Sequence, residues 1–361
     1  MRIRESLKTA RMRARGRDAT RRDEGRSRPP VPGSTGRHLP TWLIYSSGFI
    51  LIVFGVLFLG RDVILRPWTA RQWTGAVAVG DVVYVFGGQT VSSDEGLLDE
   101  ILAFDLSSHD VRLVGHLPLP AYRPQVCALD GKLYVLGGAS GPTYFSEILL
   151  FDPETEELSV AGQLPGGRAL GGVAEAGGRL YYVGGRDQAR HLDEVVEFDP
   201  STGESRVLMN LPTPIYSPAV AAAGDCLYVI GGEYNDSARI VRSNLILEID
   251  LATNTVIRTA SLPSARSWTA AAAIGGDVYV LGGWVGESLD DIVHIGTDSA
   301  QLRVEVVGRL DQTAARHVLA VVDDHLVLIG GDLAARQREL PVIEIDPETL
   351  TQVRHRFRGS I

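Results

Sequence analysis

Arginines at fixed distances before a repeated glycine pair are the residues of this chain best suited to chemistry. The pairs begin at residues 87, 137, 184, 231, 282 and 330. The positions sixteen residues before each first glycine are Arg71, Ala121, Arg168, Ile215, Arg266 and Ala314. The positions fourteen residues before it are Trp73, Arg123, Leu170, Ser217, Trp268 and Arg316. Because a guanidinium binds carboxylate and sulfate groups through paired hydrogen bonds, the pattern indicates an anion site.

Arginine alternates between the two positions from one repeat to the next, and Ser217 is the single exception. Two residues that are two apart in an extended strand lie on the same side of the chain, about 6.5 Å from each other. We therefore predict a ring of five guanidiniums and two indoles facing a carboxylate, a sulfate or a sugar acid: Arg71, Trp73, Arg123, Arg168, Arg266, Trp268 and Arg316. The alternative is structural. Each arginine then bonds loop carbonyls where two repeats meet, and the alternation is a trace of a duplicated pair of repeats.

The loops that follow the glycine pairs supply further candidates for the same surface. Their first residues are Gln89, Ala139, Arg186, Glu233, Trp284 and Asp332. Loops on a rigid scaffold commonly carry binding residues, although most polar loop residues are simply solvated. We include Arg186, Glu233 and Trp284 among the ligand-binding residues because each carries a charge or an indole.

The glycine pair belongs to a longer repeat that sets the elements around these residues. Residues 81–88 (DVVYVFGG) have five further copies, whose glycine pairs follow at intervals of 50, 47, 47, 51 and 48 residues. Each unit has two apolar runs around a two-residue turn of glycine and aspartate, which is typical of a β-hairpin. In five units a third run ends in an acid, as at Asp105 and Asp152, and a fourth run follows a short turn. Six units of four antiparallel strands predict a six-bladed β-propeller.

The units resemble kelch repeats, which combine a double glycine, a tyrosine three residues before it and an acid after the third strand. The tyrosine is present in five units, and Val327 replaces it in the sixth. The resemblance covers residues 68–361 and implies an all-β, six-bladed kelch-type propeller. We expect the acids to be turn residues, because Asp-Pro and Asp followed by Ser or Thr are turn signals. The ring closes either with the sixth unit's own fourth strand, near 350–357, or with residues 62–66 as an outer strand.

Two enzymes of similar architecture define the catalytic alternatives. Galactose oxidase needs tyrosine, histidine and a cysteine-modified tyrosine around copper, whereas the eight histidines here show no ligand spacing. N-acetylneuraminate epimerase, a sialic acid mutarotase with a six-bladed kelch propeller outside the bacterial cytoplasm, resembles this chain more closely in size and in expected location. Its reaction needs an acid, a base and a carboxylate clamp, which Glu233 and the arginines could supply. We favour a module that binds a protein or glycan ligand, with no catalytic residues, no metal and no cofactor.

The distribution of charge along the chain indicates which kinds of partner the protein could bind. Residues 1–40 contain twelve basic and four acidic residues, while the whole chain has a formal net charge of −9. The remaining body is therefore strongly acidic, which argues against nucleic acid as the main partner. The two cysteines, Cys127 and Cys226, lie in apolar runs and are expected to be buried structural thiols.

The N-terminal region has the pattern of a membrane anchor. Residues 1–40 are expected to be disordered, and residues 41–60 include an uncharged apolar run of eighteen residues. As a helix this run spans roughly 27 Å, close to the ~30 Å core of a bilayer. The basic excess before it predicts a cytoplasmic N-terminus, a linker at 61–67 and an extracytoplasmic propeller at 68–361 on a single-pass cell-membrane anchor. A cleaved signal peptide is the alternative, but the run is long and no small-residue cleavage site follows it.

Overall fold

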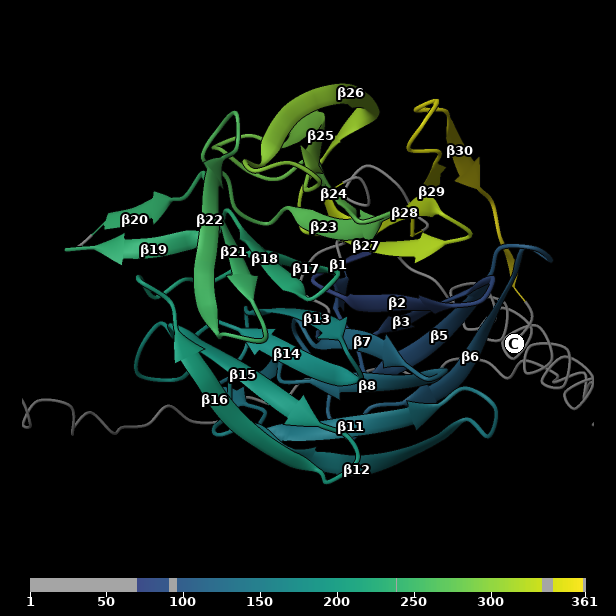
Figure 1. Ribbon diagram of the computed structural model, residues 1–361. Helices are drawn as coiled ribbons and strands as arrows, with labels where there is room; N and C mark the ends of the chain where they lie inside the picture. Colours follow the sequence, from purple (N-terminus) through teal and green to yellow (C-terminus); the bar gives the residue numbers. More distant parts are fainter. Residues whose placement is uncertain (1–69, 91–95, 238, 333–339, 360–361) are drawn as a thin grey trace, which may run out of the picture. The chain divides into compact units, whose positions relative to one another are not determined.

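The structure is a computed structural model, and it describes residues 70–90, 96–237, 239–332 and 340–359. These residues form strands and turns, and they include no α-helix. Six sheets of four antiparallel strands follow one another in the sequence, and the innermost strands of neighbouring sheets are in contact around a closed ring (Figure 1). The six-bladed propeller expected from the repeats is confirmed.

Each blade is a meander in which successive strands pair with one another. The first blade contains β2 (Gly75–Val79), β3 (Val82–Phe86), β5 (Glu100–Asp105) and β6 (Asp110–His116). The second contains β7 (Gln125–Leu129), β8 (Lys132–Leu136), β11 (Glu147–Asp152) and β12 (Glu157–Gln163). The third contains β13 (Gly172–Ala176), β14 (Arg179–Val183), β15 (Glu194–Asp199) and β16 (Glu204–Asn210).

The remaining blades repeat this order. The fourth contains β17 (Ala219–Ala223), β18 (Cys226–Ile230), β21 (Leu245–Asp250) and β22 (Thr255–Ser261). The fifth contains β23 (Ala270–Ile274), β24 (Asp277–Leu281), β25 (Leu289–Gly296) and β26 (Arg303–Ala314). The sixth contains β27 (His317–Val322), β28 (His325–Gly330), β29 (Val342–Ile345) and β30 (Gln352–His355). The loops add three short pairs: β1 (Arg71–Gln72) with β4 (Gln89–Thr90), β9 (Ala139–Ser140) with β10 (Thr143–Tyr144), and β19 (Glu233–Asp236) with β20 (Arg239–Arg242).

The alternation of side chains along the strands builds a core between every two blades. Successive residues of a strand point to opposite faces of its sheet. In β3, Val83 and Val85 pack with the sixth blade, whereas Tyr84 and Phe86 pack with the second. The same arrangement produces six apolar clusters, one at each blade junction. Burial of both faces fixes the register, because a slip of one residue would exchange the two sets of side chains.

The turns lie where the sequence places them. The inner hairpin of each blade closes through two residues, as at Gly80 and Asp81, where Val79 pairs with Val82. Where the third strand ends in an acid, its carboxylate accepts backbone N–H groups of the following turn. At Asp105 the hydrogen bonds from the two serines that follow lower the pKa of the carboxyl below its usual value. These acids are therefore turn residues, as expected.

The C-terminus completes the ring. β30 is the fourth strand of the sixth blade, which is one of the two closures that the sequence left open, and the chain then reaches the first blade. There β31 (Arg358–Gly359) pairs in parallel with β6, and the Arg358 N–H donates to the His109 carbonyl at 2.8 Å. Phe357 packs edge-on against Phe104, with ring centres 5.0 Å apart. The alternative closure by residues 62–66 lies outside the described residues.

The predicted tail (1–40), membrane helix (41–60) and linker (61–67) also lie outside the described residues. Within the part of the chain that the structure describes, no helix is long and apolar enough to cross a membrane. Both cysteines are free thiols, and Cys127 is buried as expected, whereas Cys226 is only half-buried.

Candidate functional site

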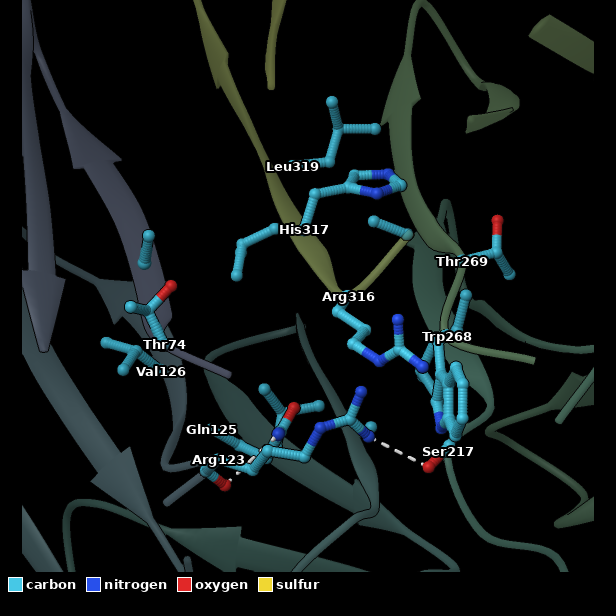
Figure 2. A pocket seen from close by; sticks show the side chains of 18 of the residues that line it. Thr74, Arg123, Gln125, Val126, Ser217, Trp268, Thr269, Arg316, His317 and Leu319 are labelled. Atoms are coloured by element: carbon cyan, nitrogen blue, oxygen red, sulfur yellow. Dashed lines mark hydrogen bonds between the residues drawn. The ribbon is translucent and has the colours of Figure 1, made fainter. Parts of the chain in front are cut away.

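The residues fourteen positions before the glycine pairs form a ring where the chain enters the innermost strands, and we call them the mouth ring. All six have a positive φ, between 50° and 63°: Trp73, Arg123, Leu170, Ser217, Trp268 and Arg316. A left-handed backbone is rare for large side chains, and such strained positions gather at functional sites. A cavity of about 140 Å³ is lined by all six innermost strands and by five of these residues (Figure 2).

The mouth ring is built from pairs of neighbouring blades. The backbone N–H of Arg123 donates to the Trp73 carbonyl at 2.9 Å, and that of Arg316 donates to the Trp268 carbonyl at 3.0 Å. The side chains of these pairs stack, because the guanidinium carbons lie 4.3 Å and 4.0 Å from the respective indole centres. The sequence pattern of tryptophan and arginine in alternate repeats therefore has a physical counterpart in two Trp–Arg pairs.

The prediction that five arginines converge is wrong for Arg71, Arg168 and Arg266. Their side chains are buried at the blade junctions. Each pairs with an acid at or near the start of the third strand, namely Glu100, Glu194 and Asp291. The residue two positions after each of these arginines has a left-handed backbone, so the chain is not extended there. The side chains sixteen and fourteen residues before the glycine pair therefore do not lie on the same side. The structural alternative holds for these three arginines.

The glycine pairs explain why this position is buried. The N–H of Gly232 donates to the carbonyl of Arg266 in the next blade at 2.8 Å. A Cβ on Gly231, whose φ is 62°, would lie 2.6 Å from that same oxygen. The backbone at the position sixteen residues before each glycine pair thus connects one blade to the next. Arg266 also donates from Nη1 to the carbonyl of Gly282 at 3.0 Å, which ties this connection to its own blade.

Arg316 lies at the mouth and is held firmly. Its guanidinium carbon is 4.0 Å, 4.9 Å and 5.1 Å from the ring centres of Trp268, Trp284 and Trp73. Its Nη1 donates to both carboxylate oxygens of Asp332, at 2.7 Å and 2.8 Å. Trp284 and Asp332 come from the loops after the glycine pairs, so these loops share the rim with the mouth ring, as expected. Stacking holds a guanidinium by its face and leaves its in-plane N–H groups for a ligand.

Arg123 is the one predicted ring arginine that forms no ion pair with a described carboxylate. Its Nη1 donates to the Ser217 hydroxyl at 2.8 Å, and Figure 2 shows its guanidinium beside that of Arg316. Burial lowers the pKa of Arg123 to about 10, and the positive charge of Arg316 acts in the same direction. The group is still protonated at neutral pH. Two cations that repel each other at one mouth, one of them without a counter-ion, favour a bound anion.

Glu233 and Arg186 lie on the side of the rim where the mouth ring carries its smallest residues. Glu233 is 3% exposed, and its Oε1 accepts a hydrogen bond from Ser267 at 2.7 Å. Burial and a hydrogen bond to this carboxylate raise the pKa of Tyr216. Arg186 is half-buried, with its guanidinium carbon 6.0 Å from the centre of the Tyr144 ring. The structure therefore brings these two predicted residues to the rim but not onto the Trp–Arg pairs.

Sequence reasoning missed two residues and misjudged a third. Tyr122 packs 5.3 Å from Trp73, and only its place between the two arginine positions marked it. His317 lines the cavity, and burial lowers its pKa to about 4, but no repeat pattern singled it out. Ser217 was the apparent failure of the pattern. Its neutral hydroxyl accepts the hydrogen bond from Arg123, so Arg123 has no acidic partner there.

The chemistry that this arrangement supports is the binding and orientation of an anion. It offers two guanidiniums, a cluster of aromatic rings and hydroxyl groups around one cavity. Across the described residues no group of three His, Cys, Asp or Glu side chains is placed to hold a metal ion.

Comparison with known proteins agrees with the fold and the repeats. Residues 63–209 match the family model described as the KLHDC2/KLHL20/DRC7 Kelch-repeats domain. The match to this kelch-repeat model covers less than half of the chain, and the described residues as a whole have the fold of a six-bladed propeller. An F-box/kelch-repeat protein of Arabidopsis thaliana is 31% identical over 71 residues, which are 20% of this chain and 18% of that protein, so the match spans less than a fifth of the relative. The solved structure of YjhT aligns with a TM-score of 0.65 and 18% identity, over 80% of this chain and 99% of that one, and this likeness concerns the fold.

Proposed function

We propose that this kelch propeller is a binding module whose mouth ring takes a carboxylate-bearing protein or glycan ligand. The observation that carries the proposal is the environment of Arg123. The other four predicted ring arginines each have an acid, whereas Arg123 has the Ser217 hydroxyl. A ligand carboxylate in front of Arg123 would supply the missing counter-ion, and a hydrogen bond to a charged group contributes about 1.5–3 kcal/mol.

The mouth is also pre-organised for such a ligand. Trp73 and Trp268 pack with ring centres 5.6 Å apart, and Trp268 and Trp284 with centres 5.8 Å apart. The guanidiniums that stack on these rings lose little further freedom when they bind. Less ordering on binding leaves more of the interaction energy as affinity.

We further propose that the module is presented outside the cytoplasm by one N-terminal membrane helix. The support is the uncharged run within residues 41–60 and the basic excess that precedes it. Protease added to intact cells should digest the propeller and leave the anchor in the membrane. Complete protection, or a soluble mature form that begins near residue 61, would contradict this topology.

Ser217→Asp tests the anion site directly. Aspartate tolerates the left-handed φ of 53° at this position and would place a fixed carboxylate beside Arg123. We expect the affinity of the full-length protein for D-glucuronate, measured by calorimetry in mild detergent, to fall at least about tenfold. Ser217→Asn is the matched control, because it has the same shape without the charge, and it should keep the affinity within about threefold. Equal affinities of the wild-type protein and Ser217→Asp for D-glucuronate would contradict the proposal.

Glu233 favours a second candidate function, an enzyme that acts on sugar acids. A buried carboxylate beside Tyr216 and near an anion site has the composition of an acid–base pair. Its Oε1, however, already accepts from Ser267 and lies 3.4 Å from the Nε of Arg242, so we rank binding first. Polarimetry and solvent-deuterium exchange on a panel of sugar acids separate the two functions. Turnover that disappears in Glu233→Gln would establish the enzyme.

A further inference from the structure

The two sides of the rim differ in the size of their side chains. On one side, four aromatic rings pack in a chain with centres 5.3–5.8 Å apart: Tyr122, Trp73, Trp268 and Trp284. On the opposite side, the third and fourth blades contribute Leu170 and Ser217 to the mouth ring. We call this side the open sector.

Arg186 stands at the edge of the open sector. Its backbone pairs with that of Ala169, the neighbour of Leu170. Its Nε reaches the carbonyl of Asp187 at 3.4 Å, a long contact, and it makes no ion pair with a described acid. Arg190, in the same loop, behaves differently because it pairs with Asp193 and Glu194. Arg186 is therefore a second cation on the rim that has no counter-ion in the described structure.

Neutral hydrogen-bonding groups lie near Arg186 on the fourth-blade side of the open sector. The rings of His191 and Tyr216 lie in a tilted contact with centres 4.3 Å apart, and Tyr216 is the chain neighbour of Ser217. Burial, and then the charge of Arg186, lower the pKa of His191, so the imidazole is neutral at pH 7 and both donates and accepts. The negative charge of Glu233 acts to raise the pKa of both Arg123 and His191. This middle part of the sector suits hydroxyl groups, so the carboxylate of an intervening sugar would have to face away from it.

We propose that the open sector is a second subsite, and that the ligand is an acidic oligosaccharide with one carboxylate at Arg123 and another at Arg186. The hydroxyls of the intervening sugar then meet the half-buried His191, whose ring packs on that of the buried Tyr216. The inference rests on the proposed function and narrows its ligand to a uronic acid oligomer. An acidic peptide offers the carboxylates but no array of hydroxyls for the neutral groups, so the saccharide fits better.

The test compares galacturonate with trigalacturonate on the full-length protein by calorimetry. The trimer should bind at least about tenfold more tightly than the monomer, because the second contact is made within one complex. Arg186→Ala should reduce that gain to about threefold or less, so that the trimer loses more affinity than the monomer does. Arg190→Ala removes the same charge from the same loop at a residue with acid partners, and it should keep the gain. A thermal melt confirms that each variant is folded.

The outcomes separate the two levels of the argument. If neither saccharide binds, the proposed function fails. If the monomer binds and the trimer gains nothing, the anion site stands and the second subsite is refuted. If triglutamate binds as tightly as trigalacturonate, the saccharide assignment is overturned in favour of an acidic peptide. If Arg190→Ala removes the gain as fully as Arg186→Ala, the effect is one of general charge and the subsite is again refuted.

Discussion

Both carboxylate oxygens of Asp291 accept hydrogen bonds from Arg266, at 2.6 Å from Nη1 and 2.7 Å from Nη2. The Arg266 side chain is completely buried, and the Ser264 hydroxyl accepts a further bond from Nη2 at 2.8 Å. A guanidinium with its donors engaged in this way has nothing left to offer a ligand. Arg266 therefore holds the fifth blade together and does not belong to the anion site.

Arg266→Ala should accordingly destabilise the fold. Removal of one partner leaves the other as a poorly solvated charge, and broken buried pairs of this kind cost about 3–5 kcal/mol. Urea denaturation measures the loss. The double change Arg266→Ala with Asp291→Leu should recover part of it, because the orphaned carboxylate is gone. Wild-type stability of Arg266→Ala, together with weaker anion binding, would return Arg266 to the ligand site.

The fold could be predicted from the sequence because the strand signals repeat six times in register. Each hairpin turn, glycine pair and turn acid is a local feature, and repetition confirmed the reading of each one. The site could be predicted only in part. The spacing located the rim and the Trp–Arg pairs. It did not show that Arg123 and Arg316 lie at the mouth whereas the other three arginines are buried, because that difference depends on backbone conformation. No local signal predicts a positive φ at tryptophan or arginine, since these residues rarely adopt it.

A closer reading of the other residues at each position would have given a hint. The position of Arg71 is shared with alanine and isoleucine, which suits a buried connection between blades. The position of Arg123 is shared with tryptophan, leucine and serine, a mixture that suits side chains at a partly exposed rim. The partners of the arginines remained hidden, because Ser217 lies 94 residues from Arg123 and the two meet only in the folded propeller.

The contact of Phe357 with Phe104 should be a measurable part of ring closure. Phe104 is fully buried, and Phe357 covers it at the point where β31 joins the first blade. Phe357→Ala should lower the free energy of unfolding by about 2–4 kcal/mol, near the lower part of the range for large-to-small changes. The control is Val353→Ala on β30, whose side chain is 51% exposed and whose loss should change stability little. Equal thermal melting of the two variants would show that closure does not depend on this contact.

Arg316→Lys should weaken anion binding although the charge is retained. Lysine lacks the planar group that stacks on Trp268 and donates to Asp332 while it keeps other in-plane donors free. We expect the affinity for glucuronate to fall about five- to thirtyfold, the equivalent of one or two hydrogen bonds. Calorimetry at two salt concentrations provides the measurement. An unchanged affinity would mean that Arg316 acts as a point charge, and that the stacked geometry is not needed.

The buried imidazole of His317 should impose a pH dependence on stability. It is 7% exposed, and burial lowers its pKa to about 4, whereas a histidine in the unfolded chain has a pKa of about 6.5. Between these values the unfolded state binds a proton that the folded state does not. The contribution of His317 is therefore fully present above about pH 6.5 and is lost as the pH falls towards 4, with a slope of up to about 1.4 kcal/mol per pH unit. His317→Asn should flatten the urea-unfolding free energy over this window. A His317→Asn protein with the wild-type slope between pH 6.5 and 5 would show that the imidazole gains a proton in the folded state as readily as in the unfolded chain.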